Sequence, residues 1–190
     1  MIKKITFSLK LSLLIILPIR SEEDINPDLA LSYFMQGEFL MSQGNYALAI
    51  LEFQEAIAID PNASTIHVAI ADGYIKVGKL KRSETHLKIA IELDPDETEG
   101  LDMLGQIYFS QKRHSDAQQI YKRLHTTDPD NLDYIFILAD LHRIQKNWDS
   151  SIDYYMLAYN VNTLAIKGLE QALQIALSTN KLKRAEEICE

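Results

Sequence analysis

The chain has 190 residues, a formal net charge of −8 at neutral pH, and a hydrophobic content of 47%. Nucleic acids and anionic lipid surfaces select clustered lysine and arginine, so this acidic balance argues against both as partners. The single cysteine, Cys189, excludes an internal disulfide framework.

The first 21 residues predict a secretory signal peptide. Residues 1–10 contain three lysines and no acid, residues 11–19 (LSLLIILPI) are apolar, and a polar run follows. A retained membrane anchor is one alternative, although nine apolar residues fall short of the roughly 20 that span hydrocarbon. A cytosolic chain with a chance apolar start is another. We expect export (periplasmic, envelope-associated or secreted), a mature protein that begins near Glu22, and no stable membrane insertion after processing.

Four prolines recur at a fixed interval of 34 residues: Pro27, Pro61, Pro95 and Pro129. Each lies between two Asn or Asp residues. A fixed period of this length is typical of stacked repeat proteins. Proline disfavours helix in the residue before it, so each proline is predicted to end a helix. The Asp or Asn after it is predicted to cap the next helix.

Between the prolines, apolar residues fall on one face of two successive helices separated by a polar or glycine-containing turn. We number each unit from the third residue after its proline. Position 8 is always small, which predicts that another backbone approaches there: Gly37, Ala71, Gly105 and Ala139. Position 20 is also small: Ala49, Ser83, Ala117 and Ser151. Position 24 is large: Phe53, Leu87, Tyr121 and Tyr155.

This pattern resembles the tetratricopeptide repeat, a 34-residue unit with small residues at positions 8, 20 and 27 and proline at 32. The resemblance covers residues 30–165 and is carried by stretches such as 47–64 (ALAILEFQEAIAIDPNAS). It implies an all-α fold, an α-solenoid of stacked helix–turn–helix repeats. The chain departs from the pattern at Gln36, which falls at a core position, and at His67 and His142, which fall in aromatic slots.

The predicted organisation is a signal peptide or short anchor (1–21), a linker (22–29), four repeats (30–63, 64–97, 98–131 and 132–165) and a partial, capping fifth repeat (166–190). Cys189 falls at a packing position of the fifth repeat. Terminal repeats are often atypical because one face has no neighbour. The alternative is that the chain is a fragment of a longer repeat protein with a missing effector domain.

The sequence contains no pattern that predicts catalysis. It has no glycine-rich phosphate loop, zinc-helix motif or nucleophile elbow. The histidines lack metal-ligand spacing, and His67, His114 and His142 occupy packing positions. We therefore expect no enzymatic activity, no cofactor, no metal and no small-molecule substrate.

The resemblance implies that the first helix of each unit lines a concave groove. At the corresponding positions, acids alternate with large apolar residues, and apolar residues that recur on an exposed stripe indicate a binding surface. The candidate groove residues are Phe34, Glu38, Val68, Asp72, Ile75, Glu99, Asp102, Phe109, Asp133, Phe136 and Asp140.

These residues predict a non-enzymatic scaffold or adaptor whose partner is a protein or peptide segment, basic and with interspersed apolar residues. The alternative is a cytosolic tetratricopeptide chaperone for secreted substrates. Chaperone-binding members of the family hold a terminal carboxylate with Lys, Arg and Asn side chains. The corresponding places here are Phe34, Glu38, Ala69, Glu99 and Met103, and the acids among them would repel a carboxylate.

Overall fold

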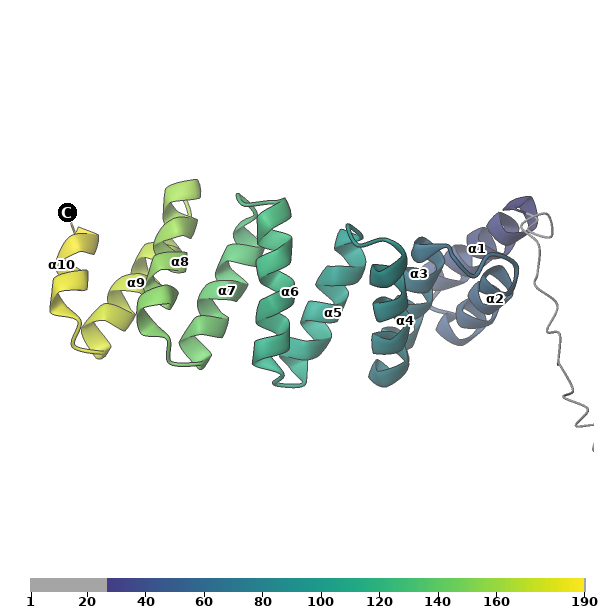
Figure 1. Ribbon diagram of the computed structural model, residues 1–190, viewed down its shortest axis with the longest axis horizontal. Coiled ribbons are helices and arrows are strands. Elements are labelled where there is room, and N and C mark those ends of the chain that lie inside the picture. The colour runs from purple at the N-terminus through teal and green to yellow at the C-terminus, as the bar shows by residue number, and fades with distance from the viewer. Residues whose placement is uncertain (1–26, 190) are drawn as a thin grey trace, which may run out of the picture.

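The computed structural model describes residues 27–189, which form ten helices and no strand (Figure 1). In chain order they are α1 (Pro27–Ser42), α2 (Tyr46–Ile59), α3 (Ser64–Lys76), α4 (Leu80–Leu93), α5 (Thr98–Ser110), α6 (His114–Thr127), α7 (Leu132–Ile144), α8 (Trp148–Val161), α9 (Ile166–Ser178) and α10 (Leu182–Cys189). The predicted signal peptide and most of the predicted linker lie outside the described residues. None of the described helices is long and apolar enough to cross a membrane.

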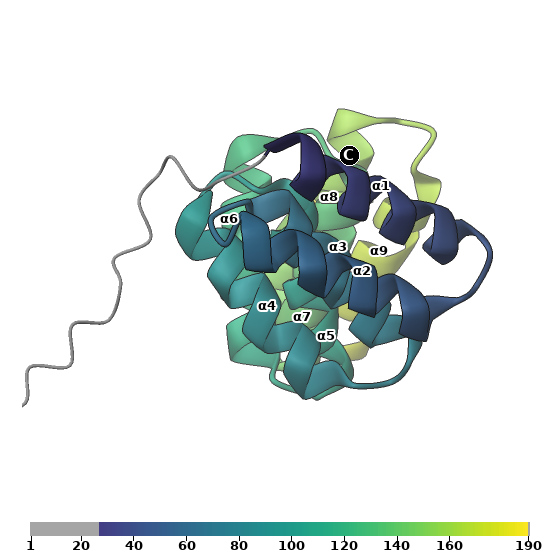
Figure 2. The same cartoon turned by 90° about the vertical axis from the view of Figure 1, so that its right-hand side faces the viewer.

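The helices stack in chain order into one elongated row, with α1 at one end and α10 at the other (Figure 1). Viewed along the row, the helix pairs lie one behind the next (Figure 2). The helices α3, α5 and α7 begin at Ser64, Thr98 and Leu132, so the structural period equals the 34-residue sequence period. This confirms the predicted α-solenoid. The division at the predicted repeat boundaries stays a prediction.

The glycines at position 8 make room for an aromatic ring of the second helix. A Cβ on Gly37 would lie 2.4 Å from Phe53 Cε1, and a Cβ on Gly105 would lie 2.8 Å from Tyr121 Cε2. The nearest atoms to a Cβ at these two glycines thus belong to a side chain rather than to a backbone. The ring at position 24 fills the space between the two helices, which explains why one position is small where the other is large.

Pro61, Pro95 and Pro129 lie in turns between helix pairs, whereas Pro27 is the first residue of α1. The capping of the helices that follow these turns differs from the prediction. Asn131 accepts hydrogen bonds from the amides of Asp133 and Tyr134, and Glu97 accepts one from Glu99. The residue directly after proline is therefore not the cap, because each of these helices begins three residues after its proline. The acid before proline shapes the turn instead, since Asp94 Oδ1 accepts from the Asp96 amide at 3.0 Å.

The turns inside helix pairs each contain one residue with left-handed backbone. These residues are Gly44 (φ 76°), Gly78 (φ 73°), Lys112 (φ 60°), Lys146 (φ 61°) and Asn180 (φ 56°). Left-handed backbone lets the chain reverse after the helix and satisfy its last carbonyls. Glycine adopts it freely, whereas a residue with a Cβ is strained there.

Four side chains at packing positions differ in their environments. His67 and His142 are buried as expected. Gln36 is exposed, because no helix pair precedes α1 among the described residues to cover that face. Cys189 is also exposed, which corrects its predicted packing role.

Candidate functional site

The first helices of successive pairs line a groove with three hollows. The first hollow, of about 280 Å³, is bounded by Phe34, Glu38, Met41, Thr65, Val68, Ala69, Asp72, Glu97 and Glu99. The second, of about 380 Å³, is bounded by Asp102, Gln106, Asn131, Asp133, Tyr134, Phe136, Ile137 and Asp140. A third, of about 180 Å³, is bounded by Gln106, Phe109, Ser110, Tyr121 and Ile137. Of the candidate residues, Ile75 alone lines none of these three hollows.

The first hollow gathers carboxylates from three helices. Glu38 comes from α1, Asp72 from α3 and Glu99 from α5. Partial burial raises the pKa of Glu38, and the negative charges of Asp72 and Glu99 raise it further. Lys76 lies 3.7 Å from Asp72 and offsets part of this charge. The hollow therefore favours a cation over an anion.

The apolar wall of the first hollow differs from the predicted stripe. Phe34 is half-buried and lies 5.8 Å from the Phe53 ring, measured between ring centroids. Val68 is only 5% exposed. Its Cγ2 would lie 3.3 Å from a Cβ on Gly100, so the start of α5 covers it. Ile75 is half-buried and packs against the core. Both residues were expected to be exposed, and neighbouring helices cover them instead.

The second hollow holds two carboxylates in fixed positions. Asp102 accepts hydrogen bonds from the Tyr121 hydroxyl at 3.1 Å and from Gln106 Nε2 at 2.9 Å. Asp140 accepts from the Tyr155 hydroxyl at 2.7 Å and from Arg143 at 2.7 Å. Charge-assisted hydrogen bonds of this kind fix the orientation of a carboxylate. The groove thus presents oriented anionic groups.

Burial is the main cause of the altered acidity of the two tyrosines. It raises the pKa of Tyr121 above its usual range, and Asp102 raises it further. It also raises the pKa of Tyr155 to about 12, with Asp140 contributing in the same direction. Both hydroxyls therefore keep their protons at neutral pH and act as donors to the carboxylates.

Sequence reasoning treated Tyr121 and Tyr155 as core residues and missed their contact with the groove. Their rings are buried, but their hydroxyls reach from α6 and α8 to the aspartates of α5 and α7. A usable signal was present. Tyrosine replaces Phe53 and Leu87 at position 24 in the two later units.

Three further candidates lie along the same lining. Asp133 is exposed at the start of α7. Phe136 is half-buried, and Lys167 Nζ lies 5.6 Å from its ring centroid. Phe109 is 36% exposed and contacts the His114 ring edge-on at 5.9 Å between ring centroids. The second hollow therefore combines acids with the rings of Tyr134 and Phe136, while Phe109 borders the third hollow.

The residues that the structure describes contain no group of three His, Cys, Asp or Glu side chains that could hold a metal ion. The groove instead combines oriented carboxylates, half-buried aromatic rings and an open surface on a helical solenoid. This arrangement defines a helical repeat protein, a class that presents extended concave surfaces.

Comparison with known proteins identifies the family of this helical repeat protein. Two family models described as tetratricopeptide repeat match residues 40–107 and 103–163. The chain belongs to the tetratricopeptide repeat family, whose members use such surfaces for protein–protein interaction.

Individual relatives share parts of the chain. Hsp70-Hsp90 organizing protein 3 of Arabidopsis thaliana is 27% identical over 117 residues, which is 62% of this chain and 21% of that protein. The chain thus spans about a fifth of the length of this relative.

Solved structures share the fold. MamA residues 41 to the end from Desulfovibrio magneticus RS-1 match with a TM-score of 0.72 and 15% identity, covering 85% of this chain and 91% of that one. The first TPR of Spaghetti (RPAP3) bound to the HSP90 peptide SRMEEVD matches with a TM-score of 0.61 and 20% identity. The match covers 65% of this chain and 98% of that one.

Proposed function

We propose that the protein is a non-enzymatic scaffold or adaptor whose groove holds a basic partner segment with interspersed apolar residues. The observation that carries this proposal is the arrangement of the groove. Carboxylates from successive first helices line the first two hollows, and each of these hollows also has an aromatic ring at its border. The family supplies the general role, and the lining supplies the chemistry of the partner.

The two kinds of side chain have different roles in binding. Exposed carboxylates attract and orient a cationic segment, which mainly affects the association rate. Aromatic side chains bury area on contact and contribute most of the binding energy, on the order of 2 kcal/mol for a central residue. Phe34 and Phe136 are the anchors of the first two hollows, and Phe109 borders the third.

The lining disfavours an acidic terminal peptide of the kind seen with the RPAP3 repeat. That peptide, SRMEEVD, has three acidic residues among its last four. In this chain Glu38 and Glu99 occupy the first hollow beside Asp72. Like charges at close range are destabilising, so we expect selection for a basic segment instead.

A binding titration tests the proposal. The probes are two labelled 12-residue peptides with the same leucine and phenylalanine positions, one with lysine and arginine between them and one with glutamate. We expect the basic peptide to bind and its affinity to fall with added salt, because exposed charges are screened over about 8 Å at physiological ionic strength. Equal binding of both peptides would contradict the role of the acids.

Variants locate the binding surface. Phe109→Ala and Phe136→Ala should each speed dissociation of the basic peptide, whereas the pair Asp102→Lys and Asp133→Lys should slow association. The matched control is Gln119→Ala, an exposed residue on a second helix. If the control abolishes binding while the groove variants retain it, the outer face is the working surface.

We propose, from the sequence of residues 1–21, that the protein is exported and processed near Glu22. Amino-terminal sequencing of the native protein after cell fractionation tests this. Replacing Leu14 and Ile15 with charged residues should leave the full-length chain in the cytosol. A native protein that starts at Met1 in the cytosolic fraction would favour the chaperone alternative, and one extracted only by detergent would favour an anchor.

A further inference from the structure

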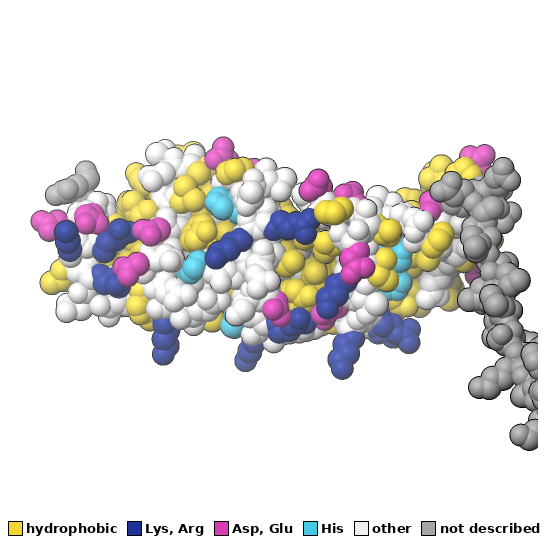
Figure 3. Space-filling model, viewed as in Figure 1, with side chains coloured by type: hydrophobic (Ala, Val, Ile, Leu, Met, Phe, Trp, Pro, Cys, Tyr) yellow, Lys and Arg dark blue, Asp and Glu magenta, His cyan; other side chains and the backbone are white. Residues whose placement is uncertain are grey.

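One long edge of the solenoid is basic. The turns inside the helix pairs from α3–α4 to α9–α10 lie along this edge (Figure 1), and lysine and arginine side chains project from it (Figure 3). We define the basic edge by the cations in these turns and in the first turn of the following helices: Lys79, Lys81, Arg82, Lys112, Arg113, Lys146, Lys181, Lys183 and Arg184.

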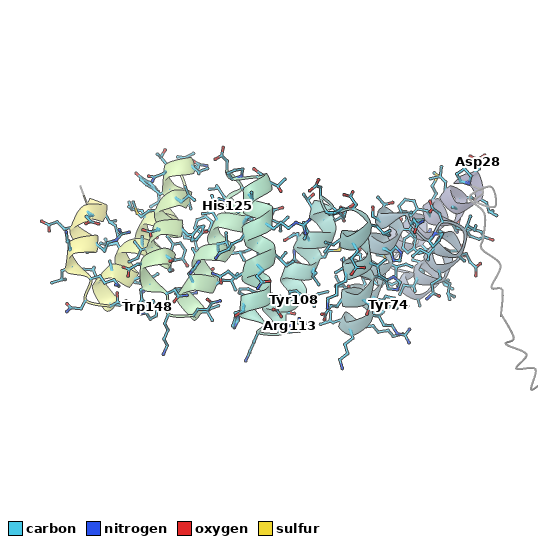
Figure 4. The ribbon with its side chains drawn as sticks, viewed as in Figure 1. Asp28, Tyr74, Tyr108, Arg113, His125 and Trp148 are labelled. Atoms are coloured by element: carbon cyan, nitrogen blue, oxygen red, sulfur yellow. The ribbon has the colours of Figure 1, made fainter. Side chains whose placement is uncertain are left out.

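The opposite edge is acidic. It carries the turns between helix pairs and the start of α1, where Asp28 lies across the row from the side of Arg113 (Figure 4). We define the acidic edge by the acids at these places: Asp28, Asp60, Asp94, Asp96, Glu97, Asp128 and Asp130. Arg123 also reaches this edge, where its guanidinium donates to the Pro95 carbonyl. The acids outnumber it.

Much of this edge charge is not neutralised within the chain. Arg113 pairs with Glu84 and Asp116, and Lys181 pairs with Asp149. In contrast, Lys79, Lys112 and Lys146 are exposed and form no ion pair with another residue in the described range 27–189.

The acidic edge also carries charges that are not neutralised within the described residues. Asp28, Asp96 and Asp130 are exposed, and none of them forms an ion pair with a residue that the structure describes. Each edge therefore keeps a row of charges that are available to an external partner.

Two of the lysines on the basic edge occupy strained positions. Lys112 and Lys146 have left-handed backbone, with φ of 60° and 61°, where the first two helix pairs have Gly44 and Gly78. A residue with a Cβ is less stable than glycine in this conformation. Lysine at these two turns therefore costs stability and adds charge to the edge, which is consistent with a use for that charge.

We propose that the basic edge of one copy docks against the acidic edge of a second copy of this chain. The unpaired charges on the two edges repeat at the same interval along the chain. Lys112 and Lys146 are 34 residues apart, and so are Asp96 and Asp130, one structural repeat in each case. A second copy therefore presents acids at the same spacing as the lysines, so that several pairs form together.

Other occupants fit the basic edge less well. A lipid surface or an unrelated acidic protein does not carry the repeat spacing of this chain. The net charge of −8 also opposes approach to an anionic lipid surface.

The proposed contact joins two different surfaces, so each added copy leaves one edge of each kind free. Such a heterologous contact that does not close into a ring gives an open row of copies. An exposed ion pair contributes at most about 1 kcal/mol, so the association is weak and depends on several pairs acting together. The groove is lined mainly by the first helices, and of the acidic-edge residues only Glu97 borders a hollow, so docking at the edges leaves most of the groove open.

Sedimentation of the purified full-length chain tests the inference. At an ionic strength of about 0.01 M, where the Debye length is about 30 Å, we expect the mean mass to rise with protein concentration. At an ionic strength of about 1 M, where the Debye length is about 3 Å, the same samples should sediment as monomers. A monomer at every concentration at low salt would overturn the proposal.

Two charge-reversed variants identify the contact. The first carries Lys79→Glu, Lys112→Glu and Lys146→Glu, and the second carries Asp28→Lys, Asp96→Lys and Asp130→Lys. Each alone should remain monomeric at low salt, because the reversed residues replace unpaired charges of one edge with charges that the opposite edge of a second copy repels. An equimolar mixture should associate again. Their net charges are −8 − 6 = −14 and −8 + 6 = −2, so attraction between net charges does not explain that recovery.

The remaining outcomes oppose the proposal. If the first variant associates as the wild type does, the contact lies elsewhere. If the mixture stays monomeric, the edges do not pair with one another. Wild-type chain that is monomeric yet sediments with phosphatidylglycerol vesicles, while the first variant does not, would assign the basic edge to lipid. The proposal is independent of the groove, and Phe109→Ala should associate as the wild type does.

Discussion

Tyr155 donates a hydrogen bond from its hydroxyl to Oδ1 of Asp140 across 2.7 Å. The tyrosine belongs to α8 and the aspartate to α7, so one bond connects the packed interior of a helix pair with the lining of the groove. Arg143 donates to the same oxygen at 2.7 Å. The position of this carboxylate is therefore set by the core, and changes in the core should alter binding.

Replacing Tyr155 with Phe tests this connection. The change retains the ring and removes only the hydroxyl, while Arg143 still neutralises Asp140. We expect a loss of about 0.5–1.5 kcal/mol in the free energy of unfolding, measured by urea denaturation, because one hydrogen bond is lost. Peptide affinity should fall as well. The control is Tyr159→Phe on the same helix, and equal effects of the two changes would contradict the role of the Asp140 contact.

Position 20 is tightly packed, so a larger side chain there should lower the stability of the protein. Ala117 is fully buried where α6 crosses α5, so Ala117→Leu should overpack the crossing and cost about 1–3 kcal/mol. Gln118 is unsuitable as a control, because it is half-buried and its Nε2 lies 2.8 Å from His142 Nε2. The exposed Gln119 serves instead, and Gln119→Leu should change stability by less than about 0.5 kcal/mol. Similar small effects at both positions would mean that the packing is misassigned.

The two serines at position 20 should respond in opposite directions. Ser151 Oγ donates to the Ala139 carbonyl at 2.9 Å, so Ser151→Ala should cost about 1 kcal/mol. Ser83 Oγ is buried and has no hydrogen-bond partner among the described residues. Ser83→Ala removes an unsatisfied polar group and should be neutral or stabilising. Thermal unfolding of both variants measures the difference, and equal losses would show that Ser83 has a partner.

A pair of contacting histidines, His67 buried and His86 half-buried, predicts loss of stability in acid. His67 Nε2 lies 3.2 Å from the Pro61 carbonyl, which can only accept, so Nδ1 of His67 accepts from His86 Nδ1 across 3.1 Å. Burial lowers the pKa of His86 to about 4, with a smaller effect from His67. An unfolded histidine has a pKa near 6.5.

Between pH 6.5 and 4 the unfolded state therefore binds more protons than the folded state, and stability falls as the pH falls. The contribution of the neutral His86 to stability is fully present above about pH 6.5. Because the ring is only half-buried, we expect a loss of about 1–2 kcal/mol over this range. Melting temperatures at pH 7.5 and pH 4.5 measure it. The same dependence in His86→Gln would assign the effect to other groups.

The strained turns predict a stabilising substitution. Lys112→Gly and Lys146→Gly remove the strain of left-handed backbone and should each raise stability by about 0.5–1 kcal/mol. Gln111 has ordinary backbone, with φ of −82°, so Gln111→Gly should be destabilising. Chemical denaturation compares the three variants. A loss of stability in Lys112→Gly would mean that the lysine side chain makes contacts that outweigh the strain.

The sequence by itself determined the fold. The 34-residue spacing of the prolines and the alternation of small and large residues within each unit are local properties of the chain, and they predict helix pairs of fixed length. Ten of the eleven candidate groove residues could likewise be placed at a hollow, because a helix presents its faces at regular intervals.

Only the tertiary structure decided the environment of individual side chains. Val68 lies on the predicted stripe but is covered by the start of α5, and the hydroxyl of Tyr155 crosses from the core to the groove. The charged edges also depend on the stacking, because residues far apart in sequence become neighbours only when their turns align. The physical reason is that periodicity is a property of one helix, whereas burial and electrostatic neighbourhood depend on where the other helices lie.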